Sequence, residues 1–140
     1  RRSRAAALNI VPTSTGAARA IGLVLPQLKG RIDGLAYRVP VPDGSVVDLT
    51  FQSEKPIDAH AIHQAMRAAA ADSSYLGVLG YTEDPIVSSD IVGLPWSCLF
   101  DATSTVVADA HTAKVLAWYD NEFGYARRVH DLLRLIARDA

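Results

Sequence analysis

Short apolar segments, long enough for strands but too short for helices, constrain this chain more than any other feature. We predict strands at 35–39, 45–53, 78–79, 86–88, 97–101, 105–108 and 114–119. We predict a first helix from 17 that stops between 26 and 30, and further helices from 59 to about 72 and from about 122 to 137. This order favours an α+β fold: a mixed, mostly antiparallel sheet with helices packed on one face and a long C-terminal helix. A doubly wound nucleotide-binding fold does not fit it.

Composition excludes several function classes. The 140 residues, 49% of them hydrophobic, suffice for one domain. Lys plus Arg number 14 against 15 Asp plus Glu, so the basic excess of an electrostatic nucleic-acid binder is missing. No apolar run reaches the roughly 18 residues of a membrane helix, so we expect a soluble protein. The single Cys excludes an internal disulfide, and no His/Cys spacing indicates a metal site.

The chain begins Arg1-Arg2-Ser3-Arg4, without an initiator Met or an apolar signal region. We therefore expect a piece of a longer protein.

The strongest local motif is the run from Pro12 to Ala18, Pro-Thr-Ser-Thr-Gly-Ala-Ala, at a predicted helix start. Unpaired N–H groups and the helix dipole favour an anion there. Thr15 and Gly16 would add a hydroxyl and an unobstructed backbone, which suits a phosphate. An ordinary hydroxyl helix cap explains the same residues.

Arg38 lies within an otherwise apolar predicted strand. It can point to water, as most strand arginines do, or face the same anion as Thr15 through a charge-assisted contact. Arg1, Arg2 and Arg4 near the chain start are likewise solvent charges or part of an anion-binding loop. Spacing alone does not decide.

A third feature is the run from Trp118 to Tyr125, Trp-Tyr-Asp-Asn-Glu-Phe-Gly-Tyr, where a predicted strand ends and a helix begins. Residues at such a junction are held by rigid elements on both sides. The Asn121 amide both donates and accepts, so it can recognise a carboxamide. The alternative is a capping Asp or Asn beside a packed aromatic pair.

The remaining reactive side chains indicate no catalytic group. Cys98 lies in an apolar segment typical of an inert, buried thiol. His60 and His63 are three residues apart on the second predicted helix, and His130 is on the last, without a third ligand or a paired nucleophile. The sequence contains no G-x-G-x-x-G, GxxxxGK[ST], G-x-S-x-G or HExxH motif.

Taken in order, several segments resemble glyceraldehyde-3-phosphate dehydrogenase. They are Arg2–Ala18, Leu25–Gly30, Arg38–Pro42, Ser45–Leu49, Gly77–Tyr81, Val87–Asp90 and Trp118–Tyr125. The resemblance covers essentially all 140 residues and implies that residues 1–140 are part of that family's catalytic domain.

The resemblance also implies roles. Thr15 and Gly16 match an inorganic-phosphate contact, Arg38 a substrate-phosphate contact, and Arg2 an arginine that feeds the anion sites. Asn121 matches the residue that binds the nicotinamide carboxamide, and Tyr125 an aromatic beside that ring. NAD is the implied cofactor, with NADP not excluded. A phosphorylated aldehyde and inorganic phosphate are the implied substrates, in a cytoplasmic, glycolytic homotetramer.

The family's nucleophilic Cys and its partner His lie upstream of Arg1, and Cys98 does not replace them. We therefore expect the isolated 140 residues to be inactive. Two alternatives stay open: a non-catalytic assembly module from a truncated gene, and an enzyme of the erythrose-4-phosphate dehydrogenase type.

Overall fold

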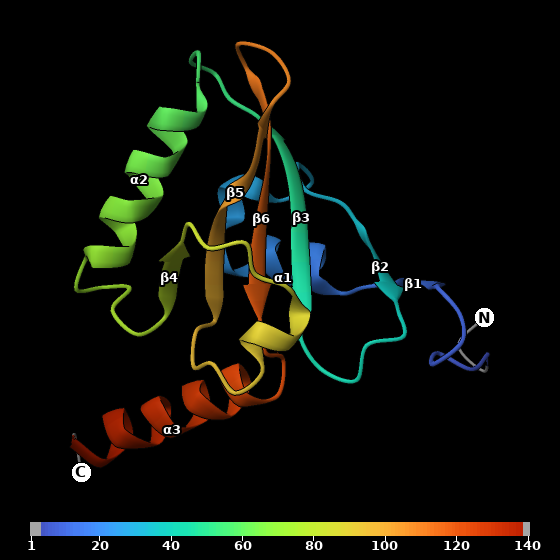
Figure 1. Ribbon diagram of the computed structural model, residues 1–140. Helices are drawn as coiled ribbons and strands as arrows, with labels where there is room; N and C mark the ends of the chain where they lie inside the picture. Colours follow the sequence, from blue (N-terminus) through green and yellow to red (C-terminus); the bar gives the residue numbers. More distant parts are fainter. Residues whose placement is uncertain (1–3, 139–140) are drawn as a thin grey trace. The chain divides into compact units, whose positions relative to one another are not determined.

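The computed structural model of the protein describes residues 4–138 and divides the chain into two compact units, residues 1–42 and 43–140. Each unit has its own sheet (Figure 1).

The first unit is a two-stranded antiparallel sheet whose strands are joined by a helix. Strand β1 (Val11–Ser14) pairs with β2 (Leu35–Arg38), so that Val11 lies opposite Arg38. Between them lie α1 (Ala17–Val24) and the 3₁₀ turn η1 (Pro26–Leu28). Because Pro26 has no N–H to donate, the α-helix ends before it.

The second unit is built on a four-stranded sheet in the order β3-β6-β5-β4. Its strands are β3 (Ser45–Gln52), β4 (Leu79–Thr82), β5 (Cys98–Val107) and β6 (Thr112–Tyr119). The β3–β6 and β6–β5 pairs are antiparallel, whereas β4 runs parallel to β5. The sheet is therefore mixed, with antiparallel pairing predominant.

Helix α2 (Ala59–Ala71) packs against β4 and β5. It begins where the Asp58 carboxylate accepts the Ala61 N–H at 2.7 Å, a standard N-cap. The His63 ring packs in T-shaped geometry with the rings of Tyr81 and Phe100, which stack on each other with centroids 5.8 Å apart. These three rings join the helix to the sheet.

The core of the second unit is small and contains the buried carboxylate of Asp101. Its most buried apolar side chains are Ile91, Phe100 and Ala113. Asp101, 2% exposed, accepts hydrogen bonds from Thr103, Ser104 and the Trp118 indole. Burial would raise the pKa of this carboxyl, but these hydrogen bonds lower it below its ordinary value. The bulge between Asp101 and Val106 lets one strand continue past this cluster.

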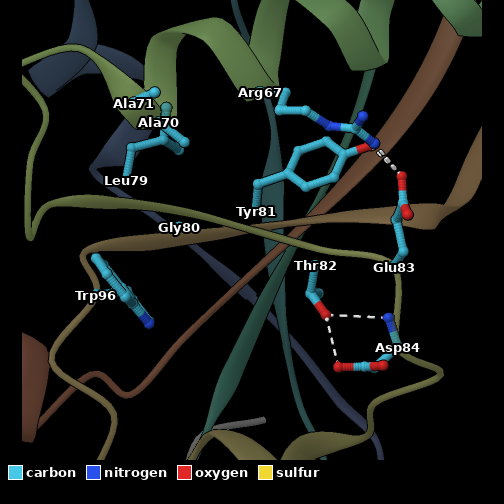
Figure 2. A pocket seen from close by; sticks show the side chains of 10 residues that line it. All are labelled: Arg67, Ala70, Ala71, Leu79, Gly80, Tyr81, Thr82, Glu83, Asp84 and Trp96. Atoms are coloured by element: carbon cyan, nitrogen blue, oxygen red, sulfur yellow. Dashed lines mark hydrogen bonds and ion pairs between the residues drawn. The ribbon is translucent and has the colours of Figure 1, made fainter.

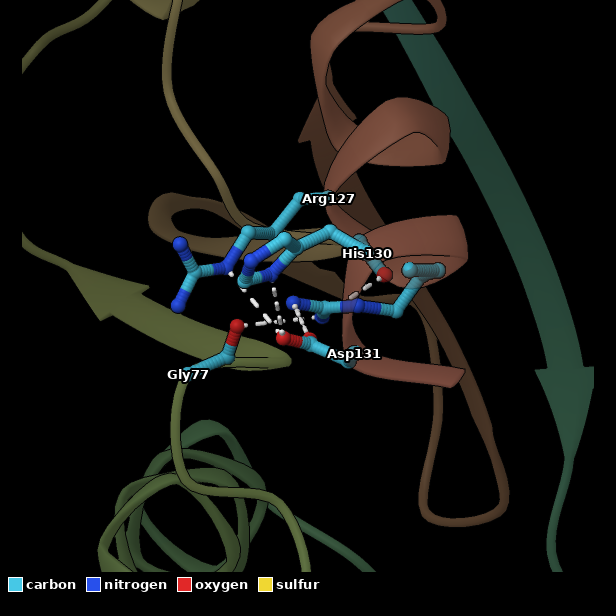
Figure 3. A network of polar contacts seen from close by, with 6 residues as sticks. Gly77, Arg127, His130 and Asp131 are labelled. Carbon is cyan, nitrogen blue, oxygen red and sulfur yellow. Dashed lines mark hydrogen bonds and ion pairs between the residues drawn. The ribbon is translucent and has the colours of Figure 1, made fainter. Parts of the chain in front are cut away.

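The first half of helix α3 (Phe123–Arg138) contacts the segments that lead into the sheet strands. Gly124 is buried so close to the Trp96 carbonyl that a Cβ would lie 3.0 Å from that oxygen. Arg128 donates to the Gly77 carbonyl at 3.0 Å and to the Ser97 hydroxyl at 3.2 Å. Asp131 pairs with Arg128, and Arg127 and His130 lie beside it (Figure 3).

The predicted α+β class is confirmed, two predictions about elements are wrong, and one strand was not predicted. Residues 86–88 form no strand: Val87 is extended, but Asp90 accepts its N–H and the 3₁₀ turn η2 (Ser88–Ile91) follows. The predicted strands 97–101 and 105–108 are one strand, β5, interrupted by the bulge. β1 was not predicted as a strand, because Pro12 argues against a strand and the Thr and Ser residues after it favour a helix start.

Candidate functional site

Arg38, at the end of β2, lines a cavity of about 500 Å³ in the first unit. The residues around it are Arg4, Ala6, Val11, Thr13, Ser14 and Arg38. The register explains the grouping, because Arg38 lies opposite Val11 and Thr13 projects from the same side of β1. Two guanidinium groups and two hydroxyls around one hollow form a donor set suited to an anion with several oxygens.

Thr15 and Gly16 lie at the start of α1 and are not among the residues that line this cavity. The Thr15 hydroxyl accepts the Ala17 N–H at 3.1 Å in a local turn, whereas the N-cap residue of α1 is Gly16. The Thr15 hydroxyl can still donate its own hydrogen, because a hydroxyl is both a donor and an acceptor. A Cβ built on Gly16 would meet nothing within 4 Å, so the space beside this backbone is open. The structure thus groups Arg38 with Thr13 and Ser14, the residues directly before the predicted pair. Arg2 lies outside the described residues.

Asp120, at the turn between β6 and α3, organises the second predicted site. It is 3% exposed. One carboxylate oxygen accepts the N–H groups of Glu122 and Phe123, and the other accepts the Gly93 N–H at 2.7 Å. The hydrogen bond from Gly93, followed by those from Phe123 and Glu122, lowers the pKa of Asp120 below its ordinary value. The carboxylate therefore fixes the backbone on both sides of Asn121.

Asn121 itself is exposed, with both ends of its amide engaged. Its Oδ1 accepts a hydrogen bond from the Ser45 hydroxyl at 3.0 Å, and its Nδ2 donates to Glu122 at 3.3 Å. Tyr125 lies in the first turn of α3 and is 72% exposed. The sequence indicated Asn121 and Tyr125, and it offered Asp120 only as a cap. It gave no signal for Ser45, which is 76 residues away along the chain.

A larger hollow of about 610 Å³ lies in the second unit, between α2 and the edge strand β4 (Figure 2). Arg67 stacks over the Tyr81 ring, 4.9 Å from its centroid, and pairs with Glu83. No sequence-predicted site residue lines this hollow. The Arg67 guanidinium is already paired with the Glu83 carboxylate, so these two charges neutralise each other.

The remaining candidates have structural surroundings. Cys98 is half-buried at the start of β5, and burial raises the pKa of its thiol, which disfavours the nucleophilic thiolate. Between residues 4 and 138, no group of three His, Cys, Asp or Glu side chains could hold a metal ion. Within the same range, no helix is long and apolar enough to cross a bilayer.

Fold and sites together define the class: an α+β domain with an arginine-lined hollow and a rigid strand-to-helix turn.

Residues 1–121 match the family model described as glyceraldehyde 3-phosphate dehydrogenase, C-terminal domain. A glyceraldehyde-3-phosphate dehydrogenase of Mycolicibacterium smegmatis is 58% identical over 138 residues, 99% of this chain and 40% of the relative. One from Borreliella burgdorferi is 54% identical over 139 residues, 99% of this chain and 42% of the relative. One from Streptomyces coelicolor is 54% identical over 132 residues, which are 94% of this chain and 39% of the relative.

The chain belongs to the glyceraldehyde-3-phosphate dehydrogenase family and corresponds to its C-terminal domain. It spans about 40% of the length of these relatives, so it matches a fragment of each. The predicted family is confirmed.

Proposed function

We propose that residues 1–140 form part of the catalytic domain of a phosphorylating, NAD-dependent glyceraldehyde-3-phosphate dehydrogenase. The overall reaction converts the aldehyde, inorganic phosphate and NAD into an acyl phosphate, 1,3-bisphosphoglycerate, with NADH and a proton. The aldehyde carbon loses two electrons as a hydride, and phosphate supplies the new oxygen ligand. Family membership supports a place in glycolysis, in the cytoplasm and in a homotetramer.

The proposal rests most on Arg38. Its guanidinium shares a hollow with Arg4, Thr13 and Ser14 in a chain of a family named for a phosphorylated substrate. A guanidinium presents a planar fork of N–H donors that matches two phosphate oxygens at once. In this role Arg38 binds the substrate phosphate, with Thr15 and Gly16 at the adjacent helix start contacting inorganic phosphate.

The turn after β6 fits the nicotinamide group by the chemistry of its donors. Asn121 offers an amide that both donates and accepts, which matches a carboxamide, and Tyr125 offers an exposed ring. When bound, NAD supplies the hydride acceptor. Asn121 then orients the carboxamide and Tyr125 shields one side of the ring.

The nucleophile and the base belong, in this proposal, to the part of the protein upstream of Arg1. Cys98 is a poor substitute because burial raises the pKa of its thiol. The exposed apolar side chains of β3, Val46, Val47 and Leu49, support assembly with further protein. They also keep the non-catalytic assembly module as a second candidate.

Replacing Arg38 in the full-length protein tests the phosphate role. We expect Arg38→Ala to raise KM for glyceraldehyde 3-phosphate or inorganic phosphate about 10- to 100-fold, the effect of losing a hydrogen bond to a charged group. Arg31→Ala is the matched control, because Arg31 is exposed in the same unit and lies outside the hollow. Steady-state NADH formation and thermal unfolding are the measurements.

Unchanged kinetics of the Arg38→Ala variant with a large loss of stability would show that Arg38 is structural. Profiling the wild-type protein with glyceraldehyde 3-phosphate and erythrose 4-phosphate separates the triose enzyme from its tetrose counterpart.

A further inference from the structure

The Ser45 side chain links the start of β3 to the turn that carries Asn121. Ser45 is the first residue of β3 and lies opposite Tyr119, the last residue of β6. The pairing of these strands brings the Ser45 hydroxyl to 3.0 Å from Asn121 Oδ1. Ser45 is half-buried, so its side chain is held by the sheet while Asn121 projects to solvent.

A second contact fixes which end of the Asn121 amide faces Ser45. Asn121 Nδ2 lies 3.3 Å from a carboxylate oxygen of Glu122. An ionised carboxylate accepts hydrogen bonds and cannot donate, so the amide nitrogen must face Glu122. The carbonyl oxygen then faces Ser45, whose hydroxyl donates to it. The contacts with Ser45 and Glu122 therefore require the same one of the two possible orientations of the Asn121 amide.

The backbone of this turn is already fixed, so the side-chain torsions are the remaining freedom of Asn121. Asp120 holds the N–H groups of Gly93, Glu122 and Phe123. The terminal torsion of Asn is broad and roughly two-fold, so an exposed amide samples both orientations unless a partner selects one. Ser45 and Glu122 each occupy one hydrogen-bonding position of the Asn121 amide. One N–H donor and one acceptor position of the oxygen therefore remain for a ligand.

We propose that Ser45 is a positioning residue that holds the Asn121 amide in the orientation required for carboxamide recognition. The ligand side of this inference rests on the proposed function, since it takes the nicotinamide carboxamide as the group that Asn121 recognises. The positioning itself rests on the Ser45–Asn121–Glu122 contacts alone.

The test uses the full-length protein with four variants: Ser45→Ala, Ser45→Thr, Asn121→Ala and the double Ala variant. Removing one hydrogen bond predicts that Ser45→Ala raises KM for NAD about three- to tenfold, without changing KM for the aldehyde. Ser45→Thr keeps the hydroxyl and restores the wild-type KM. The double variant has the same KM for NAD as Asn121→Ala, because Ser45 acts only through Asn121. Additive effects in the double variant would overturn the inference.

A structural readout separates this inference from the proposed function. We expect the side-chain amide resonances of Asn121, assigned by NMR with Asn121→Ala, to shift in Ser45→Ala and return in Ser45→Thr. A wild-type protein without dehydrogenase activity contradicts the proposed function, while this shift still supports the positioning role. Unmoved Asn121 resonances in a folded Ser45→Ala variant contradict the positioning role, whatever the activity.

Discussion

Asp120 shows how one buried side chain fixes the backbone of a candidate site. Both of its oxygens are occupied by backbone N–H groups, two from the start of α3 and one from Gly93. The N–H groups of Glu122 and Phe123, at the start of α3, would otherwise be left without an intrahelical partner. The same carboxylate therefore begins the helix and fixes the backbone on both sides of Asn121.

Replacing Asp120 by Ala should lower the free energy of unfolding by about 2–3 kcal/mol, because a helix cap and a buried charge-assisted hydrogen bond are lost together. Asp120→Asn should cost less, since its amide oxygen still accepts. Equilibrium denaturation with urea measures both. A loss for Asp120→Ala below about 0.5 kcal/mol, the range of ordinary surface substitutions, would contradict this account.

The pH dependence of stability has a definite sign. The pKa of Asp120 is lower in the folded chain than its ordinary value of 3.8, so the folded state favours the ionised form. The stabilisation is fully present above that ordinary value and is lost as pH falls through the folded pKa. The stability difference between wild type and Asp120→Ala should therefore shrink below about pH 4. A difference that grows with acid would contradict the assignment.

At the scale of elements, Arg128 is the side chain that ties α3 to the sheet. It reaches the carbonyl before β4 and the hydroxyl before β5, and it pairs with Asp131 one turn along the helix. Arg127, its neighbour, makes only a half-exposed ion pair with Asp131 at 3.5 Å. Such exposed pairs contribute little to stability.

Arg128→Ala should lower the free energy of unfolding by about 2–3 kcal/mol through the loss of these hydrogen bonds, and Arg127→Ala by less than about 0.5 kcal/mol. Amide hydrogen exchange should also become faster in α3 of the Arg128 variant, because the helix loses its attachment. Equal effects of the two substitutions would show that the helix is held in another way.

The sequence predicted most elements because their signals are local. Asp58 before an Ala-rich run and the apolar periodicity after residue 122 indicate α2 and α3 directly. β1 was missed because a four-residue strand containing Pro12 exists through its pairing with β2, which is not a local property. Residues 86–88 were predicted as a strand because extended, apolar residues look the same whether or not a neighbouring strand is present.

In the candidate sites, too, the sequence predicts the features that are local and misses those that depend on strand pairing. Asn121 stands out because an amide at a strand-to-helix junction is visible in the sequence. Ser45 was not recognisable, since only the β3–β6 register brings it to Asn121. The grouping of Arg38 with Thr13 and Ser14 likewise follows from the β1–β2 register rather than from spacing. The roles of Arg38, Thr15, Gly16, Asn121 and Tyr125 remain predictions.

On the scale of the whole molecule, a large share of apolar surface is uncovered. Helix α3 exposes more than half of Leu132, Leu133 and Ile136, and β3 exposes much of Val46, Val47 and Leu49. A monomeric soluble protein rarely leaves such extended apolar faces open. The chain also matches only about 40% of the length of its relatives. Both observations agree with a part that functions together with further protein.

The most direct measurement of the central proposal is NADH formation by a chimera. Residues 1–140 replace the matching 40% of the Mycolicibacterium smegmatis relative, and the isolated segment is assayed beside it. With glyceraldehyde 3-phosphate, NAD and phosphate, we predict turnover that depends on phosphate for the chimera and no turnover for the isolated segment. In the chimera, Arg38→Ala should raise KM for glyceraldehyde 3-phosphate or inorganic phosphate about 10- to 100-fold. A chimera that folds and assembles but forms no NADH would contradict the proposed function, as would turnover by the segment alone.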